Sequence, residues 1–226
     1  MATLIYSVED DESIRELIAY TLTNAGYKVS SFVTAEEMLS GLEKQFPELI
    51  VLDIMLPGIS GIEALKIIRE KYKNANIKVV MLTAKNTEFN KIHGLDMGAD
   101  DYITKPFSVL ELIARVKAHL RTTKPFKSGI ATYGGLTVNT ATRIAKSKDK
   151  EINLTWTEFE LLLALISKAG TIVTREELLN GIWGCDNYGE SRTVDIHMKN
   201  LRAKLGLNGS CIVNVRGVGY TLKELK

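Results

Sequence analysis

The first 120 residues alternate short apolar runs with amphipathic stretches, and this pattern constrains the fold more than any other feature. The apolar runs end near Val8, Ser31, Leu52, Leu82 and Thr104. Two of them, Ile50–Leu52 and Val79–Leu82, are continuously apolar, which is typical of strands buried on both faces. Between the runs lie helical patterns such as Ser13–Asn24, which is followed by a stop signal at Gly26. Five strand–helix units predict a doubly wound α/β domain with a parallel sheet.

Polar side chains follow four of these predicted strands. Glu9, Asp10 and Asp11 follow the first, Asp53 the third, Thr83 the fourth, and Lys105 the fifth. In a doubly wound sheet, ligands bind beyond the carboxyl ends of the strands. We therefore expect these side chains to meet in one pocket.

The chemistry of this set favours phosphoryl transfer. Crowded carboxylates repel each other unless a cation neutralises them, and Mg²⁺ is the cation that prefers oxygen ligands and keeps several waters. A carboxylate can itself accept a phosphoryl group, and Asp53 stands alone on its strand end. Lys105 would neutralise phosphoryl charge and Thr83 would donate to one oxygen.

Each of these residues also has a simpler interpretation. Glu9, Asp10 and Asp11 could form the acidic first turn of the following helix, where negative charge is favourable. Asp53, which precedes Pro57 and Gly58, could be an ordinary loop aspartate. Their occurrence at successive strand ends makes coincidence a poor explanation.

The second half of the chain differs in charge and in pattern. Residues 1–120 hold 13 Lys/Arg and 17 Asp/Glu, a formal charge of −4, whereas residues 121–226 hold 16 and 10, a charge of +6. The polar stretch 122–130 is the expected linker between domains 1–121 and 131–226. Short strands are expected between Gly134 and Lys146 and near Ile152. A basic domain makes nucleic acid a candidate partner.

Three helices are predicted in this basic half. Thr155 with Glu158 and Thr174 with Glu177 are capping-box patterns that open helices 156–167 and 175–183. A third helix, 191–205, has an apolar face at Val194, Met198, Leu201 and Leu205. A basic helix after a helix–loop–helix fits the major groove of DNA, where Lys and Arg bind phosphates or guanine and Asn200 could read adenine. A solvated helix face would look similar.

The end of the chain adds a hairpin to these helices. Residues 212–222 alternate around Gly217 and Gly219, which predicts a β-hairpin with Arg216 near its tip. Arg216 could there reach a phosphate or the minor groove.

The motifs of the first half resemble the receiver domain of two-component response regulators. They are Val8–Asp11 (VEDD), Leu52–Gly58 (LDIMLPG), Met81–Ala84 (MLTA) and Gly98–Phe107 (GADDYITKPF). The resemblance implies a flavodoxin-like, CheY-like (βα)5 fold and phosphorylation of Asp53 by a sensor histidine kinase. It also implies an acidic pair at Glu9 and Asp10, with Mg²⁺ held by Asp10, Asp53 and the Met55 carbonyl. Thr83 and Tyr102 would form the switch pair, and Lys105–Pro106 would be a cis peptide bond.

The motifs of the second half resemble the winged-helix effector domain of the OmpR/PhoB type. They are Thr157–Leu162 (TEFELL), Arg175–Leu179 (REELL), Arg192–Met198 (RTVDIHM) and Val215–Tyr220 (VRGVGY). The resemblance implies an α+β winged helix-turn-helix domain that binds double-stranded promoter DNA. It assigns the DNA contacts to Arg192, Thr193, His197, Lys199, Asn200, Arg202 and, in the wing, Arg216. Asn200 stands where relatives often carry a second basic residue.

The same resemblance implies a homodimer of the phosphorylated receiver. Lys91 would pair with Glu111 across the two subunits, and Asp101 with Arg115. A third pair would join Asp100 to residue 122, where this chain has Thr122 instead of arginine; Arg121 lies beside it.

The expected function is a phosphorylation-controlled DNA-binding transcriptional regulator of a two-component system, not an enzyme. The alternative is a DNA-binding regulator that works without phosphorylation and whose receiver only dimerises. Phosphatases of the haloacid-dehalogenase class need a second aspartate two residues after the nucleophile, where this chain has Met55. RNA polymerase is a candidate further partner. The short apolar runs and the absence of a basic start predict a cytoplasmic protein without a membrane partner.

Overall fold

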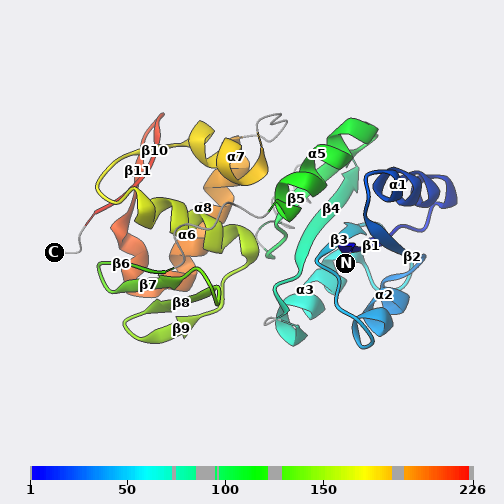
Figure 1. Ribbon diagram of the computed structural model, residues 1–226, viewed down its shortest axis with the longest axis horizontal. Helices are drawn as coiled ribbons and strands as arrows, with labels where there is room; N and C mark the ends of the chain where they lie inside the picture. Colours follow the sequence, from blue (N-terminus) through cyan, green and yellow to red (C-terminus); the bar gives the residue numbers. More distant parts are fainter. Residues whose placement is uncertain are drawn as a thin grey trace. The chain divides into compact units, whose positions relative to one another are not determined.

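The computed structural model describes residues 2–72, 75–84, 95, 97–121, 129–184 and 191–223. The chain divides into two compact units, Met1–Leu120 and Arg121–Lys226. Each unit is described by itself (Figure 1).

The first unit is built on a five-stranded parallel sheet, as the alternating pattern predicts (Figure 1). In spatial order its strands are β2 (Lys28–Phe32), β1 (Leu4–Val8), β3 (Leu49–Asp53), β4 (Lys78–Ala84) and β5 (Asp101–Lys105). All four pairings are parallel, so the carboxyl ends share one edge. The order reverses at β1, which lies between β2 and β3. This switch point is where a doubly wound sheet leaves room for a ligand.

Helices cover both faces of this sheet. They are α1 (Glu12–Asn24), α2 (Ala35–Leu42), α3 (Gly61–Lys71) and α5 (Val109–Leu120). On the face of α1 and α5, Ile18, Leu22, Leu112 and Val116 pack against buried residues of β1, β3, β4 and β5. The α2 and α3 helices lie on the other face (Figure 1). Most of the segment expected to hold the fourth helix, 85–96, lies outside the described residues.

The second unit combines two antiparallel sheets with three helices. A four-stranded sheet has the order β6 (Ile130–Tyr133), β7 (Leu136–Asn139), β8 (Ile144–Ser147) and β9 (Lys150–Ile152). A three-stranded sheet has the order β10 (Val173–Thr174), β12 (Gly219–Leu222) and β11 (Ile212–Val215). The predicted hairpin is therefore present as β11 and β12, with β10 added to it.

The helices of the second unit have the bounds that the sequence predicts. They are α6 (Trp156–Ser167), α7 (Arg175–Trp183) and α8 (Ser191–Leu205). Complete capping boxes join Thr155 to Glu158 and Thr174 to Glu177. The apolar faces of the three helices meet the two sheets in one core, which includes Trp156, Trp183 and Tyr220. This is the predicted winged helix-turn-helix architecture. No helix among the described residues is both long and apolar enough to cross a membrane.

Candidate functional site

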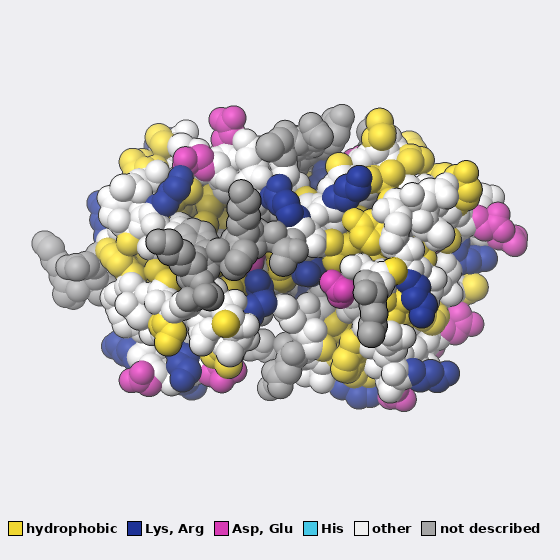
Figure 2. All heavy atoms as spheres, viewed as in Figure 1, with side chains coloured by type: hydrophobic (Ala, Val, Ile, Leu, Met, Phe, Trp, Pro, Cys, Tyr) yellow, Lys and Arg dark blue, Asp and Glu magenta, His cyan; other side chains and the backbone are white. Residues whose placement is uncertain are grey.

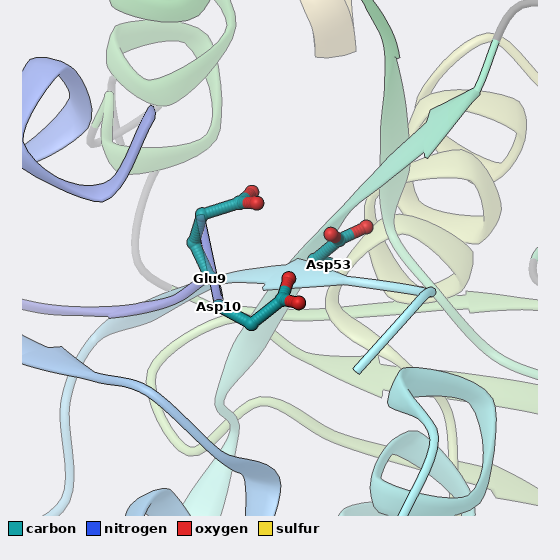
Figure 3. A group of neighbouring side chains, drawn as sticks. All are labelled: Glu9, Asp10 and Asp53. Carbon is teal, nitrogen blue, oxygen red and sulfur yellow. The ribbon is translucent and has the colours of Figure 1, made fainter. Parts of the chain in front are cut away.

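Three carboxylates meet at the carboxyl edge of the parallel sheet. Glu9 and Asp10 follow β1, and Asp53 is the last residue of β3. One oxygen of each lies within 4.8 Å of the others. Figure 3 shows the Asp10 and Asp53 side chains approaching each other from the two strand ends, with Glu9 beside them. Glu9 and Asp53 are buried, while Asp10 is exposed, so the cluster has one side open to solvent.

Lys105 closes the buried side of this cluster. It is the last residue of β5, and its Nζ lies 2.7 Å from Asp53 Oδ2 and 2.6 Å from Glu9 Oε2. The Lys105–Pro106 peptide bond is cis, as the resemblance implied. One ammonium therefore ties together two carboxylates that come from different strands.

The charges of the pocket affect each other strongly. Burial raises the pKa of Glu9 to about 7; the Asp53 carboxylate adds to the rise, while Lys105 opposes it. Burial alone would lower the pKa of Lys105, but its bonds with Asp53 and Glu9 outweigh this and raise it. Like charges held this close favour either a proton or a metal cation between them. An all-oxygen donor set with an open side fits a hard divalent cation that keeps several waters.

The other residues predicted for the pocket lie on β4, on β5 and in the segment after β3. Thr83, the last residue but one of β4, is 1% exposed, and Tyr102 on β5 is 8% exposed. The Met55 side chain is 70% exposed, and its backbone N–H donates to Asp53 Oδ1 at 3.2 Å. The Met55 backbone therefore lies next to the Asp53 carboxylate, and the role of the Met55 carbonyl as a metal ligand stays a prediction.

A second charged cluster links the start of β5 to α5. Arg115 Nη1 lies 2.9 Å from Asp101 Oδ2, and Arg115 Nε lies 3.2 Å from Glu111 Oε1. His119 Nε2 is 3.2 Å from the same Asp101 oxygen. Burial would raise the pKa of Asp101, but Arg115 and then His119 more than offset this and lower it to about 2. Sequence reasoning missed His119, although its position one turn after Arg115 was a signal.

Residues that were predicted to pair across two subunits bond within their own subunit in this structure. Glu111 and Arg115, expected in two different cross-subunit pairs, are joined to each other within one chain. Asp100 is held inside its own subunit by Arg69 at 2.8 Å and by the Val79 N–H. Lys91 and Thr122 lie outside the described residues.

The predicted DNA contacts fall into two groups. Lys199 and Arg216 are exposed, and Asn200 is half-buried. Thr193 and His197 are 2% and 1% exposed, so both lie on the packed side of α8, and their contact with DNA stays a prediction. The reason is that α8 packs against both α6 and α7, which buries a stripe wider than the Val194 face. His197 stacks near the Trp183 ring, with centroids 5.6 Å apart. The Arg192 side chain lies outside the described part of α8.

Arg202 belongs to a network that joins α8 to the hairpin. Its Nε donates to the Ile212 carbonyl at 2.9 Å, and its guanidinium lies 5.4 Å from the Tyr220 ring centroid. The Tyr220 hydroxyl donates to Asp195 Oδ1 at 2.6 Å, and Arg175 Nε bonds the same oxygen at 2.9 Å. Arg202 thus holds the hairpin in place, and this role was not predicted for it.

Charge is mixed on the face of the molecule seen in Figure 2. Lys and Arg side chains are interspersed with Asp and Glu among the coloured residues, without one continuous basic patch on that face.

Two family models match the chain. The response regulator receiver domain matches residues 5–117, and the C-terminal domain of transcriptional regulatory proteins matches residues 149–222. The chain is 39% identical over 227 residues to the phosphate regulon transcriptional regulatory protein PhoB of Rhizobium meliloti, covering 99% of this chain and 100% of that protein. It is 41% identical over 235 residues to the alkaline phosphatase synthesis transcriptional regulatory protein PhoP of Bacillus subtilis, covering 98% and 97%.

Solved structures give the same architecture. A mutant of RitR aligns with a TM-score of 0.78 at 25% identity, covering 99% of this chain and 100% of that one. The response regulator DrrB of Thermotoga maritima, described as an OmpR/PhoB homologue, aligns with a TM-score of 0.53 at 33% identity, covering 98% and 99%. These likenesses extend over both units of the chain.

Proposed function

Because the chain belongs to the OmpR/PhoB family of response regulators, which control transcription through a receiver and a DNA-binding domain, we propose that Asp53 is its phosphoryl acceptor. The donor would be the phosphohistidine of a sensor histidine kinase. The observation that carries the proposal is the placement of Asp53 between Lys105 and Asp10 at the open edge of the sheet.

The phosphoryl transfer would be an in-line displacement. A carboxylate oxygen of Asp53 forms a bond to phosphorus as the nitrogen–phosphorus bond of the kinase breaks, and the histidine nitrogen leaves with the bonding electron pair. Asp10, Asp53 and the Met55 carbonyl would hold Mg²⁺, which supplies charge neutralisation when bound. Lys105, already 2.7 Å from Asp53, would follow the phosphoryl oxygens and stabilise their charge.

Two further residues would carry the change away from the pocket. The Thr83 hydroxyl would turn to donate to a phosphoryl oxygen, and Tyr102 would change its packing on β5. Such a change biases an equilibrium between two states of the receiver. The phosphorylated state would dimerise through the face of β5 and α5, with Lys91–Glu111 and Asp101–Arg115 as cross-subunit pairs.

The second unit would carry the output to DNA in the cytoplasm. The α8 helix would enter the major groove with Lys199, Asn200 and Arg192, and Arg216 would contact the backbone or minor groove from the hairpin. A dimer would then bind paired half-sites about one helical turn apart. RNA polymerase is the partner that such a promoter-bound dimer would meet. We expect slow loss of the protein's own phosphoryl group, but no turnover of an external substrate.

The intact mass of the full chain tests the acceptor directly. Wild type and Asp53→Asn are incubated with Mg²⁺ and a small acyl phosphate, and with purified histidine kinases. A gain of one phosphoryl group in wild type only supports the proposal. Modification of both proteins, or of neither with any donor, contradicts it.

DNA binding distinguishes the alternative of a regulator that works without phosphorylation. Duplexes with two half-sites are selected from a random pool, and affinity is compared for phosphorylated wild type, unphosphorylated wild type and Asp53→Asn. Tighter binding and dimer formation only after phosphorylation support the switch. Equal affinity of all three forms favours the alternative.

A further inference from the structure

The Arg15 side chain bonds the backbone of the segment that carries Glu9 and Asp10, and it offers the acidic pocket no ligand. It is in the first turn of α1, which begins at Glu12. Its Nη1 donates to the backbone carbonyl of Glu9 at 2.9 Å and to that of Asp10 at 3.0 Å. One guanidinium nitrogen therefore holds two successive carbonyls of the segment that carries two of the three clustered carboxylates.

The position of these two carbonyls determines where the carboxylates point. The peptide unit is planar, so fixing a carbonyl fixes the rotation of the peptide plane that follows each residue. The direction of a residue's Cα–Cβ bond follows once the peptide planes on both sides of its Cα are oriented. Arg15 orients the planes on both sides of Asp10, and the Glu9 N–H, which donates to the Phe32 carbonyl at 3.1 Å, orients the plane before Glu9. By holding both carbonyls, Arg15 sets the directions in which the Glu9 and Asp10 side chains leave the backbone.

Two other bonds anchor the same turn to α1. The Asp11 side chain accepts from the Ile14 N–H at 3.0 Å, and the Asp11 carbonyl accepts from the Arg15 N–H at 2.9 Å. Helix α1 therefore keeps its N-terminal cap when the guanidinium is removed. This separates the role of the Arg15 side chain from the stability of the helix.

We propose that Arg15 is a positioning residue that presets the Glu9–Asp10 turn for a divalent cation and thereby sets the Mg²⁺ affinity of the receiver. This rests on the proposed function, in which the pocket binds Mg²⁺ for phosphoryl transfer to Asp53. Groups that orient metal ligands typically change metal affinity 10- to 100-fold when they are lost. Because Arg15 acts through backbone carbonyls, we expect about a tenfold effect, the low end of this range.

The test measures Mg²⁺ binding to the full, unphosphorylated chain by isothermal titration calorimetry. The variants are Arg15→Ala, Arg15→Lys and, as a control for net charge, Lys66→Ala, which removes an exposed lysine from α3. Arg15→Ala should raise the Mg²⁺ dissociation constant about tenfold. Arg15→Lys, which keeps a cationic donor, should recover part of the affinity, and Lys66→Ala should match wild type.

Phosphorylation kinetics give a second readout that a general structural defect would not produce. With a small acyl phosphate, Arg15→Ala should need about tenfold more Mg²⁺ for half-maximal rate, while the rate at saturating Mg²⁺ stays within about twofold of wild type. Mg²⁺ affinity within twofold of wild type in Arg15→Ala would overturn the proposal. So would a fall in the saturated rate with no change in the Mg²⁺ requirement.

The proposed function itself fails in a different way. Wild type would then show neither Mg²⁺ binding nor phosphorylation, whereas failure of the Arg15 proposal leaves both intact in wild type and leaves the Mg²⁺ affinity of every variant unchanged. If Arg15→Ala proves unfolded by circular dichroism, Arg15→Gln, which removes the cationic donor, takes its place. Mg²⁺ affinity within twofold of wild type in folded Arg15→Gln then overturns the proposal.

Discussion

Replacing Arg115 by methionine should destabilise the receiver by more than a surface ion pair would. Arg115 and Asp101 are 7% and 1% exposed, so the change leaves a buried carboxylate with His119 as its remaining ionisable partner in the described part of the cluster. The Asp101 pKa of about 2 lies below its usual value of 3.8, which corresponds to roughly 2 kcal/mol of stabilisation at neutral pH. Without Arg115 the burial penalty remains, so we expect a cost of about 3 kcal/mol, within the range known for breaking buried pairs.

The pH dependence gives this prediction a sign. A carboxylate whose pKa is lower in the folded protein stabilises it fully above the unfolded pKa, and this contribution is lost as pH falls through the folded pKa. For Asp101 the contribution is therefore present above about pH 4 and disappears toward pH 2. The difference in unfolding free energy between wild type and Arg115→Met should shrink over that interval.

The assay must report the unfolding of the first unit. Tryptophan fluorescence does not do this, because both tryptophans, Trp156 and Trp183, are in the second unit. Hydrogen exchange of β5 and α5 peptides in the intact chain, followed over a urea series, gives the free energy of opening of this unit. The double variant Asp101→Asn with Arg115→Met removes both charges and should recover more than half of the loss. A cost below about 1 kcal/mol for Arg115→Met, or one that does not change below pH 4, would refute the reasoning.

Three further predictions concern the pocket, the DNA surface and the hairpin. Gly61→Ala would place a Cβ against the backbone carbonyl of Asp53, which cannot move aside. The free energy of unfolding of the receiver, measured by thermal unfolding, should fall by about 2 kcal/mol or more, and phosphoryl uptake should fall with it. Lys199→Ala should weaken binding to all DNA sequences alike and reduce the salt slope of log K by about 1, measured by fluorescence anisotropy; loss at one base position would contradict a phosphate contact. Tyr220→Phe removes the hydroxyl bond to Asp195 and should cost about 1–2 kcal/mol in urea unfolding followed by tryptophan fluorescence.

The pocket could be predicted from sequence because it depends on topology rather than on packing. Parallel strands place their carboxyl ends at one edge, so polar residues after successive strands must meet there. Glu9, Asp53 and Lys105 confirm this, with both carboxylates bonded to the one ammonium. Capping boxes were equally readable, because each depends on two residues three apart in the same segment.

Features that depend on how elements pack could not be read from local patterns. The buried stripe of α8 includes Thr193 and His197 because α6 and α7 both contact the helix. The spacing of apolar residues in α8 predicts the centre of this stripe, but not how wide it is. Short strands were predicted between Gly134 and Lys146 and near Ile152, but strands of three or four residues are too short for alternation to give their bounds or their pairing. Two of its turn residues, Lys148 and Asp149, have positive φ without being glycine, so no glycine signals that turn.

Strand β5 offers a physical link between the two charged clusters of the receiver. Lys105, its last residue, bonds Asp53 and Glu9, and Asp101, its first, bonds Arg115 and His119. Tyr102 lies between these ends and is nearly buried. A phosphoryl group on Asp53 would draw Lys105 toward the phosphoryl oxygens. The resulting shift of β5 would reach Asp101, whose ionic partners are Arg115 and His119. Coupling of this kind requires an element with two discrete arrangements that both sites bias. An exchange of Arg115 between Asp101 of its own subunit and the predicted partner in a second copy would be such an arrangement. On this hypothesis Arg115→Met should weaken the effect of phosphorylation on dimerisation, even where Asp53 is fully modified.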